Sequence, residues 1–354
     1  MVILDKYIGR TVAVSVAAVM GVLLALYLFM GFAGEFDKIG QGSYSIWGAM
    51  EYVLAQIPRR IYEFFPLSAL LGTMLGLGGL ASRSELVVIR SAGVSVLGVV
   101  VAVMKTALVL MVVATVVGEV IAPPLYQHAQ VKRAKAMAQQ ISLNTDYGLW
   151  ARDGLTFINI RRVQNDGTLE DIRLYEFDPR HRLHTITRAA TATRAHDTWV
   201  LHGVRQTFIS QDGIVLRSSA ELPWRTLLNP DLINVVSVTP EMLSAWDLHE
   251  YVRYLERNGL NPARYELAFW AKLIAPLTVG VMVLLAVPFV FGSLRSVGMG
   301  TRILVGFLVG IGFYMLNQIA GHAGVVYNLP PSVSASLPTV LVSIMALIML
   351  RRVR

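Results

Sequence analysis

The sequence predicts a membrane protein of six transmembrane helices that carries an inserted all-β domain. Of the 354 residues, 55% are hydrophobic and only 15% are charged, whereas soluble domains carry about a quarter charged residues. Several uncharged runs are long enough to cross a bilayer. More than half of the charges, 13 Lys/Arg and 15 Asp/Glu, fall between residues 139 and 263. We therefore expect the middle of the chain to be soluble and both flanks to lie in the membrane.

The net charge of +8 comes from the two flanks, which carry 18 basic and 8 acidic residues. Basic residues beside membrane helices face anionic lipid head groups, so no nucleic-acid partner is expected. The sequence contains no cysteine, which excludes a disulfide framework, a thiolate metal site and a cysteine nucleophile.

The predicted spans are uncharged or nearly uncharged runs, because a helix needs ~20 residues to cross the hydrocarbon core. The run 303–350 is too long for one helix, and Pro330-Pro331 divides it, since proline removes a backbone donor and disfavours helix in the residue before it. The predicted spans are Thr11–Gly34, Phe64–Ser82, Ser91–Ile121, Leu273–Leu294, 303–325 and 332–350. The first is too long for a signal-peptide core and is expected to be retained.

Basic residues in short loops predict the orientation, because they favour the cytoplasmic side. They are Lys6, Arg10, Arg83, Arg90, Arg295, Arg302, Arg351, Arg352 and Arg354. Both termini are therefore expected in the cytoplasm, and the insert between the third and fourth spans on the outer side. A second group of cations would then lie at the outer ends of the first three spans, against this rule: Lys38, Arg59, Arg60, Lys132, Arg133 and Lys135.

The insert is predicted to be all-β over about 146–238. Asp-Gly pairs at 153–154, 166–167 and 212–213 indicate turns. The β-branched and aromatic runs are 155–162, 171–177, 198–204 and 213–219. Short strands with turns every ~8–15 residues favour a sandwich or a jellyroll. Thr239-Pro240-Glu241 is then expected to open an amphipathic helix that ends at Asn258-Gly259 and packs through Leu248, Tyr251, Val252 and Leu255.

Catalytic motifs are missing from the sequence. Without a Gly-Lys dipeptide there is no Walker A loop for ATP phosphates. His249-Glu250 lacks the second histidine of a zincin, and no Gly-x-Ser-x-Gly elbow occurs. The seven histidines show no ligand spacing. We therefore expect a non-catalytic chain without a metal or a cofactor of its own.

Residues 84–92 are predicted to form a short cytoplasmic helix between the second and third spans. Ser82 or Ser84 is a candidate N-cap, Glu85 suits the positive first turn, and Gly93 can end the helix. Its apolar residues are Leu86, Val87, Val88 and Ile89. Such a helix either docks in a groove of a partner or lies on the lipid head groups, and composition alone leaves both open.

Five segments resemble the LptF/LptG family of lipopolysaccharide export permeases. They are GQGSY (40–44), FFPLSALLGTMLGLGGLASRSELVVIRSAGVS (64–95), GLWARDG (148–154), PFVFGSLRSVGMGTR (288–302) and YNLPPSVSASLP (327–338). They follow one another in the family's order over nearly the whole chain. The pattern is closer to the LptG branch than to the LptF branch.

The resemblance implies a bacterial inner-membrane protein with six transmembrane helices and an inserted periplasmic all-β, jellyroll-like domain. Residues 1–138 would hold spans 1–3 and a coupling helix at about 84–92, residues 139–263 the jellyroll and return helix, and residues 264–354 spans 4–6. The implied partners are an LptF-type paralogous permease, an LptB-type ATPase dimer, an LptC-type single-span protein and an LptA-type periplasmic bridge. ATP and Mg would be bound by the ATPase.

The resemblance also implies three groups of site residues. The outer cations Lys38, Arg59, Arg60 and Arg133 would bind the lipid phosphates of lipopolysaccharide. The ATPase would be contacted by Glu85, Leu86, Ile89 and Arg90. A periplasmic lipid groove would include Phe157, Ile158, Tyr175 and Phe208. The family often carries further basic residues near the end of span 1, where this sequence has Gly31 and Asp37.

Polar residues inside the spans favour a structural role. Lys105 and Glu119 lie near opposite ends of the third span, where they can reach the interface. The group Asn317, Gln318 and His322 in the fifth span either lines a gate or bonds across helices, and we favour the second.

The function that fits best is a non-catalytic permease subunit. It would extract lipopolysaccharide from the outer leaflet of the inner membrane, with energy from a partner ATPase, and pass it toward the outer membrane. The alternatives are an LptF-type paralogue, a lipoprotein-release subunit, for which four spans are expected, and a membrane-anchored periplasmic binding protein, for which one span suffices. A proton-coupled transporter would need a midplane carboxylate cluster, which the spans lack.

Overall fold

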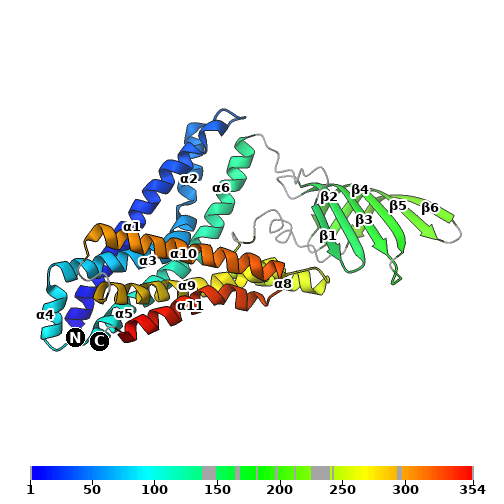
Figure 1. The fold of residues 1–354 in the computed structure, drawn as a ribbon. Coiled ribbons are helices and arrows are strands. Elements are labelled where there is room, and N and C mark those ends of the chain that lie inside the picture. The colour runs from blue at the N-terminus through cyan, green and yellow to red at the C-terminus, as the bar shows by residue number, and fades with distance from the viewer. Residues whose placement is uncertain are drawn as a thin grey trace.

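The computed structural model describes residues 2–137, 149–163, 168–180, 182–195, 198–210, 213–224, 240, 243–292 and 297–352. These residues form a helical bundle and one antiparallel sheet, joined in space by α8 (Ala245–Arg257) (Figure 1). The other helices are α1 (Val2–Ala33), α2 (Ile46–Ala55), α3 (Ile57–Ser82), α4 (Glu85–Ser91), α5 (Val96–Val116), α6 (Ala122–Ala136), α9 (Ala263–Phe291), α10 (Met299–Val326) and α11 (Pro331–Arg352).

Six of the described helical segments are long and apolar enough to cross a membrane, which confirms the predicted number of spans. They are Ile3–Lys38, Ile57–Ser82, Val96–Arg133, Ala263–Phe291, Met299–Val326 and Pro331–Arg352. The third combines α5 and α6 through a π-helical turn at Val117–Ile121. Both chain ends and α4 lie at one end of the bundle, and the sheet lies beyond the opposite end (Figure 1).

The centre of the bundle is formed by α3 and α9. In the most apolar stretch of each helix, 67% of the residues are buried for α3 but only 11% for α10. Close packing of α1 on α3 depends on two glycines one turn apart. A Cβ at Gly72 would lie 2.4 Å from Val16 Cα, and one at Gly76 would lie 3.2 Å from Val12 Cα. Small residues four apart allow two helix backbones to approach closely in a membrane.

Arg302, expected in a cytoplasmic loop, is instead a buried residue in the first turn of α10. Its Nη1 donates a hydrogen bond of 2.7 Å to the carbonyl of Gly78 in α3. A Cβ at Gly78 would lie 2.5 Å from that nitrogen. The contact therefore joins α10 to the central helix at the end of the bundle that carries α4.

The insert forms one six-stranded antiparallel sheet in which each strand pairs with the next in the chain. Its strands are β1 (Leu149–Asp153), β2 (Thr156–Val163), β3 (Leu169–Phe177), β4 (Leu183–Ala195), β5 (Thr198–Ser210) and β6 (Gly213–Trp224). The inserted all-β domain is thus confirmed, while β1 and the Ala- and Thr-rich β4 were not among the predicted strands. The Asp-Gly pair at 166–167 and Asp212 lie outside the described residues.

Neighbouring strands of the sheet depart from regular alternation of buried and exposed residues at one point. Leu169 and Ile172 on β3 are both buried although they are three residues apart, and so are Leu201 and Val204 on β5. Between them Asp171 has φ 46° and Gly203 has φ 62°. The β4 partners of Leu169 and Ile172, Ala192 and Ala189, are also buried and three residues apart, so the buried face continues across this point in all three strands.

The amphipathic helix α8 begins at Ala245, several residues later than the predicted opening at 239–241, of which 239 and 241 lie outside the described residues. Ser244 caps it: the Ser244 hydroxyl accepts from the N–H of Asp247, and the Asp247 carboxylate accepts from the N–H of Ser244. This capping box satisfies two backbone N–H groups at the start of the helix. The helix therefore begins after Ser244 rather than at the predicted proline. The predicted apolar face of α8 is buried.

Candidate functional site

The loop Gly40–Tyr44 follows the first span in the chain and is hydrogen-bonded to the end of α6. Gly40 and Gly42 have φ of 93° and 59°, which glycine adopts without strain. The backbone N–H and the hydroxyl of Ser43 donate to the carbonyl of Ala136, at 2.7 Å and 3.0 Å. Tyr44 is thereby buried between the end of α1 and α6. This segment belongs to the family-like motif at 40–44, and its structural effect is to place the Tyr44 phenol.

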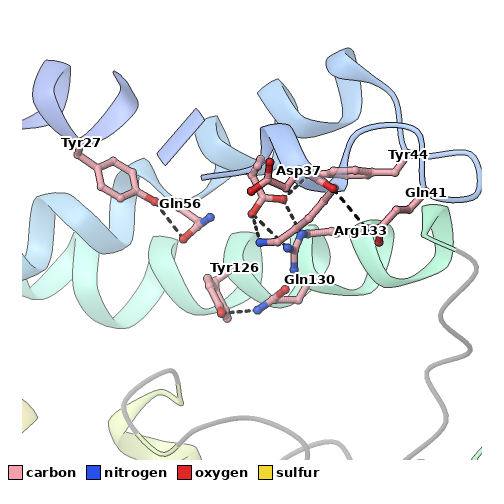
Figure 2. A network of polar contacts seen from close by, with 10 residues as sticks. Tyr27, Asp37, Gln41, Tyr44, Gln56, Tyr126, Gln130 and Arg133 are labelled. Carbon is pink, nitrogen blue, oxygen red and sulfur yellow. Dashed lines mark hydrogen bonds and ion pairs between the residues drawn. The ribbon is translucent and has the colours of Figure 1, made fainter. Parts of the chain in front are cut away.

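Glu35, just after α1, is the centre of a network that holds two of the four predicted phosphate-binding cations. Figure 2 labels two members of this network, Tyr44 and Arg133. Its Oε1 accepts from Lys38 Nζ at 2.9 Å and from Arg133 Nη2 at 3.1 Å. Its Oε2 accepts from Arg133 Nε at 2.9 Å and from the Tyr44 hydroxyl at 3.0 Å. The Arg133 guanidinium also lies 4.5 Å from the centre of the Tyr52 ring. The structure thus brings Lys38 and Arg133 together on one carboxylate.

The charges in this network do not balance. The exposed side-chain fraction rises from 8% for Glu35 to 19% for Arg133 and 37% for Lys38, so the anion is buried and the two cations lie nearer the surface. One carboxylate against two cations leaves one positive charge. Burial first, and the bond to Glu35 second, raise the pKa of Tyr44 to about 12, so the phenol keeps its proton and donates at neutral pH. The network therefore suits a further anion that reaches the two cations from the surface of the protein.

Arg59 and Arg60 form a second group on α3, around Glu63. Arg59 Nε lies 2.7 Å from Glu63 Oε1, and Arg60 Nη1 lies 2.5 Å from Glu63 Oε2. Each guanidinium also covers an aromatic ring, Arg59 over Tyr126 at 5.1 Å and Arg60 over Tyr27 at 4.5 Å. Again two cations share one carboxylate, so this group also carries one net positive charge.

Sequence reasoning identified the four cations but missed Glu35 and Glu63. A signal existed in the local spacing, because Glu35 precedes Lys38 by three residues and Glu63 follows Arg59 by four. The pairing of Glu35 with Arg133 spans 98 residues, and no local pattern predicts it.

The short helix α4 turns only part of the predicted ATPase-contacting set outward. Leu86 is buried, and Ile89 is half-buried against the bundle core, so these two predicted ATPase contacts point inward. Glu85 accepts a hydrogen bond of 2.6 Å from the Tyr7 hydroxyl of α1. The outward residues are Val87, Val88 and Arg90. A helix of seven residues is held in place by burying one of its sides. Because apolar residues occur all round α4, the sequence does not show which side is buried.

The ends of α4 follow the sequence in part. Gly93 has φ 90°, as expected of a helix-terminating glycine. Ser84 occupies the N-cap position with φ 60°, but its side chain makes no capping bond. The hydroxyl of Ser82 donates to the carbonyl of Gly79 at the end of α3 instead. The start of α4 is therefore defined by a backbone turn rather than by a serine cap.

The four predicted groove residues lie on two faces of the sheet. Ile158 is fully buried and shares its face with Leu174 and Thr187, its partners across the strands. Phe208 pairs with the buried Thr185 and lies on that face too. Adjacent strand residues point to opposite faces.

Phe157 and its cross-strand partner Tyr175 therefore lie on the other face. There Tyr175 stacks on Trp150 at 5.7 Å between ring centres, and Phe157 is 37% exposed. Contrary to the expectation from the sequence, the four residues therefore cannot all line one groove on a single face of the sheet.

The polar residues inside the spans have partners on neighbouring helices in two cases. Lys105 Nζ lies 2.6 Å from Asp5 of α1. Glu119 accepts from Lys272 Nζ at 2.9 Å and from the first helical N–H of α8, at Ala245, at 2.6 Å. Glu119 thus ties the third span to α9 and to the return helix. These contacts give both residues a structural role.

The fifth-span group lies on an exposed face of α10. In the described chain Gln318 donates to the Tyr314 hydroxyl of the same helix at 3.0 Å, and Asn317 and His322 are exposed. The predicted bonding across helices is thus not seen within this chain's described residues.

Comparison with known proteins gives consistent matches over the full length. The family model described as lipopolysaccharide export system permease LptF/LptG matches residues 6–352. The chain is 41% identical over 353 residues to the lipopolysaccharide export system permease protein LptG of Haemophilus influenzae, covering 99% of each chain. It is 40% identical over 353 residues to the protein of the same name from Escherichia coli strain K12, covering 99% of this chain and 98% of that one.

Proposed function

The chain belongs to the LptF/LptG family and is a permease component of the lipopolysaccharide export system, and we propose that its outer cations hold the lipid A phosphates during extraction. The relatives named LptG favour this branch over an LptF-type paralogue, and six spans argue against a lipoprotein-release subunit. In the proposed function the substrate leaves the outer leaflet of the inner membrane and passes to a periplasmic bridge.

The observation that carries the proposal is the gathering of Lys38, Arg133, Arg59 and Arg60 from three separate segments near one end of the bundle, each group with one positive charge in excess. Charge-assisted bonds to phosphate are strong when the donors are partly shielded from water. Cations with no orienting role would snorkel to ordinary lipid, but these four are fixed by carboxylates and aromatic rings.

The proposed orientation places both termini and α4 in the cytoplasm and the sheet in the periplasm. The grouping of both chain ends with α4, opposite the sheet, supports it (Figure 1). An LptB-type ATPase dimer would then contact α4 and supply the energy. An LptF-type permease, an LptC-type single-span protein and an LptA-type bridge would complete the assembly. The sparsely covered α1 and α10 offer membrane-facing surface for such neighbours.

The test is lipopolysaccharide binding by the purified assembly, with bound lipid identified and quantified by mass spectrometry. Lys38→Ala is expected to weaken binding roughly tenfold, as loss of one charge-assisted bond does, and Lys38→Glu more severely. Neither should change association with the ATPase, because Lys38 lies at the opposite end of the first span from α4. Equal lipopolysaccharide binding by the wild type and both variants would mean that Lys38 contacts only ordinary lipid head groups.

A further inference from the structure

Glu35 occupies donors of Arg133 and Lys38 that a substrate phosphate could otherwise take. The Arg133 fork gives it Nε and Nη2, and Lys38 gives it Nζ. With the Tyr44 hydroxyl, the carboxylate accepts four hydrogen bonds and is almost fully buried. A carboxylate and a phosphate present similar oxygen pairs to guanidinium. A phosphate therefore cannot take the Arg133 fork while Glu35 keeps it.

The three side chains are buried to different extents, and this sets the order in which an incoming anion would meet them. Lys38 is the most exposed member of the network, Arg133 is intermediate, and Glu35 lies beneath both. An anion from the membrane surface would meet Lys38 before it meets Arg133. Glu35 also prevents the two cations from facing each other uncompensated, because like charges at short range repel and burial of an unpaired charge is costly.

We propose that Glu35 is an internal counter-anion that occupies the phosphate position on Lys38 and Arg133 in the empty site and is displaced when the lipid phosphate binds. This rests on the proposed function of the outer cations. Glu35 then holds the binding groups in place, lowers the affinity for substrate and assists release, since it can retake the Arg133 fork when the lipid leaves. It is a positioning and affinity-setting residue rather than a contact to the substrate.

The experiment measures binding of lipid A with two phosphates, and of the same lipid A dephosphorylated, by the complete transporter in nanodiscs. Glu35→Gln keeps the side-chain shape and removes the charge. We expect it to raise affinity for the phosphorylated lipid roughly tenfold, because the phosphate no longer competes with a charge-assisted pair. Affinity for the dephosphorylated lipid should stay unchanged. Release on ATP addition should become slower.

The matched control is Glu51→Gln. Glu51 pairs with Lys132, the neighbour of Arg133, and both side chains are more than half exposed. This change alters the net charge equally but leaves the network intact, so its effect on affinity should stay within about twofold, as expected of an exposed pair. If Glu51→Gln gave the same gain as Glu35→Gln, the effect would be general electrostatics and the proposal would be overturned.

A second variant covers the case in which Glu35→Gln fails to assemble. Glu35→Asp keeps the charge but withdraws the carboxylate from the Arg133 fork, and we expect a smaller gain in affinity. Unchanged or reduced affinity in the assembled variants contradicts the proposal. The proposed function fails separately: Lys38→Ala and Arg133→Ala would then bind both lipids as the wild type does. If Lys38→Ala and Arg133→Ala lose lipid binding but the Glu35 variants show no gain in affinity, only the proposed role of Glu35 as a counter-anion is overturned.

Discussion

At the residue scale, the close approach of α1 to α3 is made where a side chain is absent. Gly72 and Gly76 form the pattern Gly-x-x-x-Gly on α3, facing the backbone of α1 at Val12 and Val16. Without these glycines the first span could not approach α3, and the residues just beyond it, from Glu35 to Tyr44, would lose their position.

Gly72→Ala is expected to destabilise the purified protein by about 1–3 kcal/mol, the usual range for an overpacked core. Its Cβ would overlap backbone atoms of α1, which cannot move aside as a flexible side chain does. Thermal unfolding in detergent measures the effect. Gly79→Ala on the same helix is the control, because nothing lies within 4 Å of its added Cβ. Equal unfolding temperatures for both variants would mean that α1 and α3 are not packed this closely.

Residue identities singled out the candidate cations but did not predict their geometry. Lys38 and Arg133 stood out because basic residues at outer span ends contradict the orientation rule. Their common partner Glu35 could not be inferred, since Arg133 is distant in the chain and reaches it through the packing of α6 against α2, α3 and the Gly40–Tyr44 loop.

At the element scale, the predictable part is the set of long apolar helices, because their composition matches the bilayer over a whole span. Facing was harder to predict. On α4, apolar residues occur all round, and only packing separates the buried Leu86 from the exposed Val88. On the sheet, left-handed residues break the alternation from which faces are inferred.

The facing of α4 leads to a test of coupling. Val88→Asp places a charge on the outer face, and we expect it to weaken association with the ATPase while changing the free energy of unfolding by no more than about 0.5 kcal/mol, as for an exposed substitution. Leu86→Asp should instead unfold the α4 region, because a charge would enter the bundle core. Co-purification and thermal unfolding distinguish the two. Normal ATPase binding by a folded Val88→Asp protein would exclude this face as the contact.

The two faces of the sheet give a similar comparison. A photo-crosslinker at Phe208, on the face that carries the buried cluster, is expected to capture lipopolysaccharide in an ATP-dependent manner. The same probe at Tyr175, on the opposite face, should not, because acyl chains seek the apolar face. Capture at Tyr175 alone would place the lipid path on the aromatic face with Trp150.

At the scale of the whole molecule, the two ends of the bundle are specialised differently. One end carries both termini, α4 and the buried Arg302, and the other carries the basic network and leads to the sheet (Figure 1). Glu119 connects the third span, α9 and α8. The return helix α8 is in turn joined to the sheet, because Asn258 at its end accepts a hydrogen bond of 3.0 Å from the backbone N–H of Gly154 in the β1–β2 turn.

The central claim is that the outer cations of this chain hold lipopolysaccharide phosphate during ATP-driven extraction. The most direct measurement is ATP-dependent release of lipopolysaccharide from proteoliposomes that contain the complete transporter, with wild type compared against Lys38→Ala/Arg133→Ala. We predict that the double variant assembles and hydrolyses ATP but releases less than a tenth of the lipopolysaccharide, as expected for the loss of two charge-assisted bonds. Wild-type release by an assembled double variant would contradict the account.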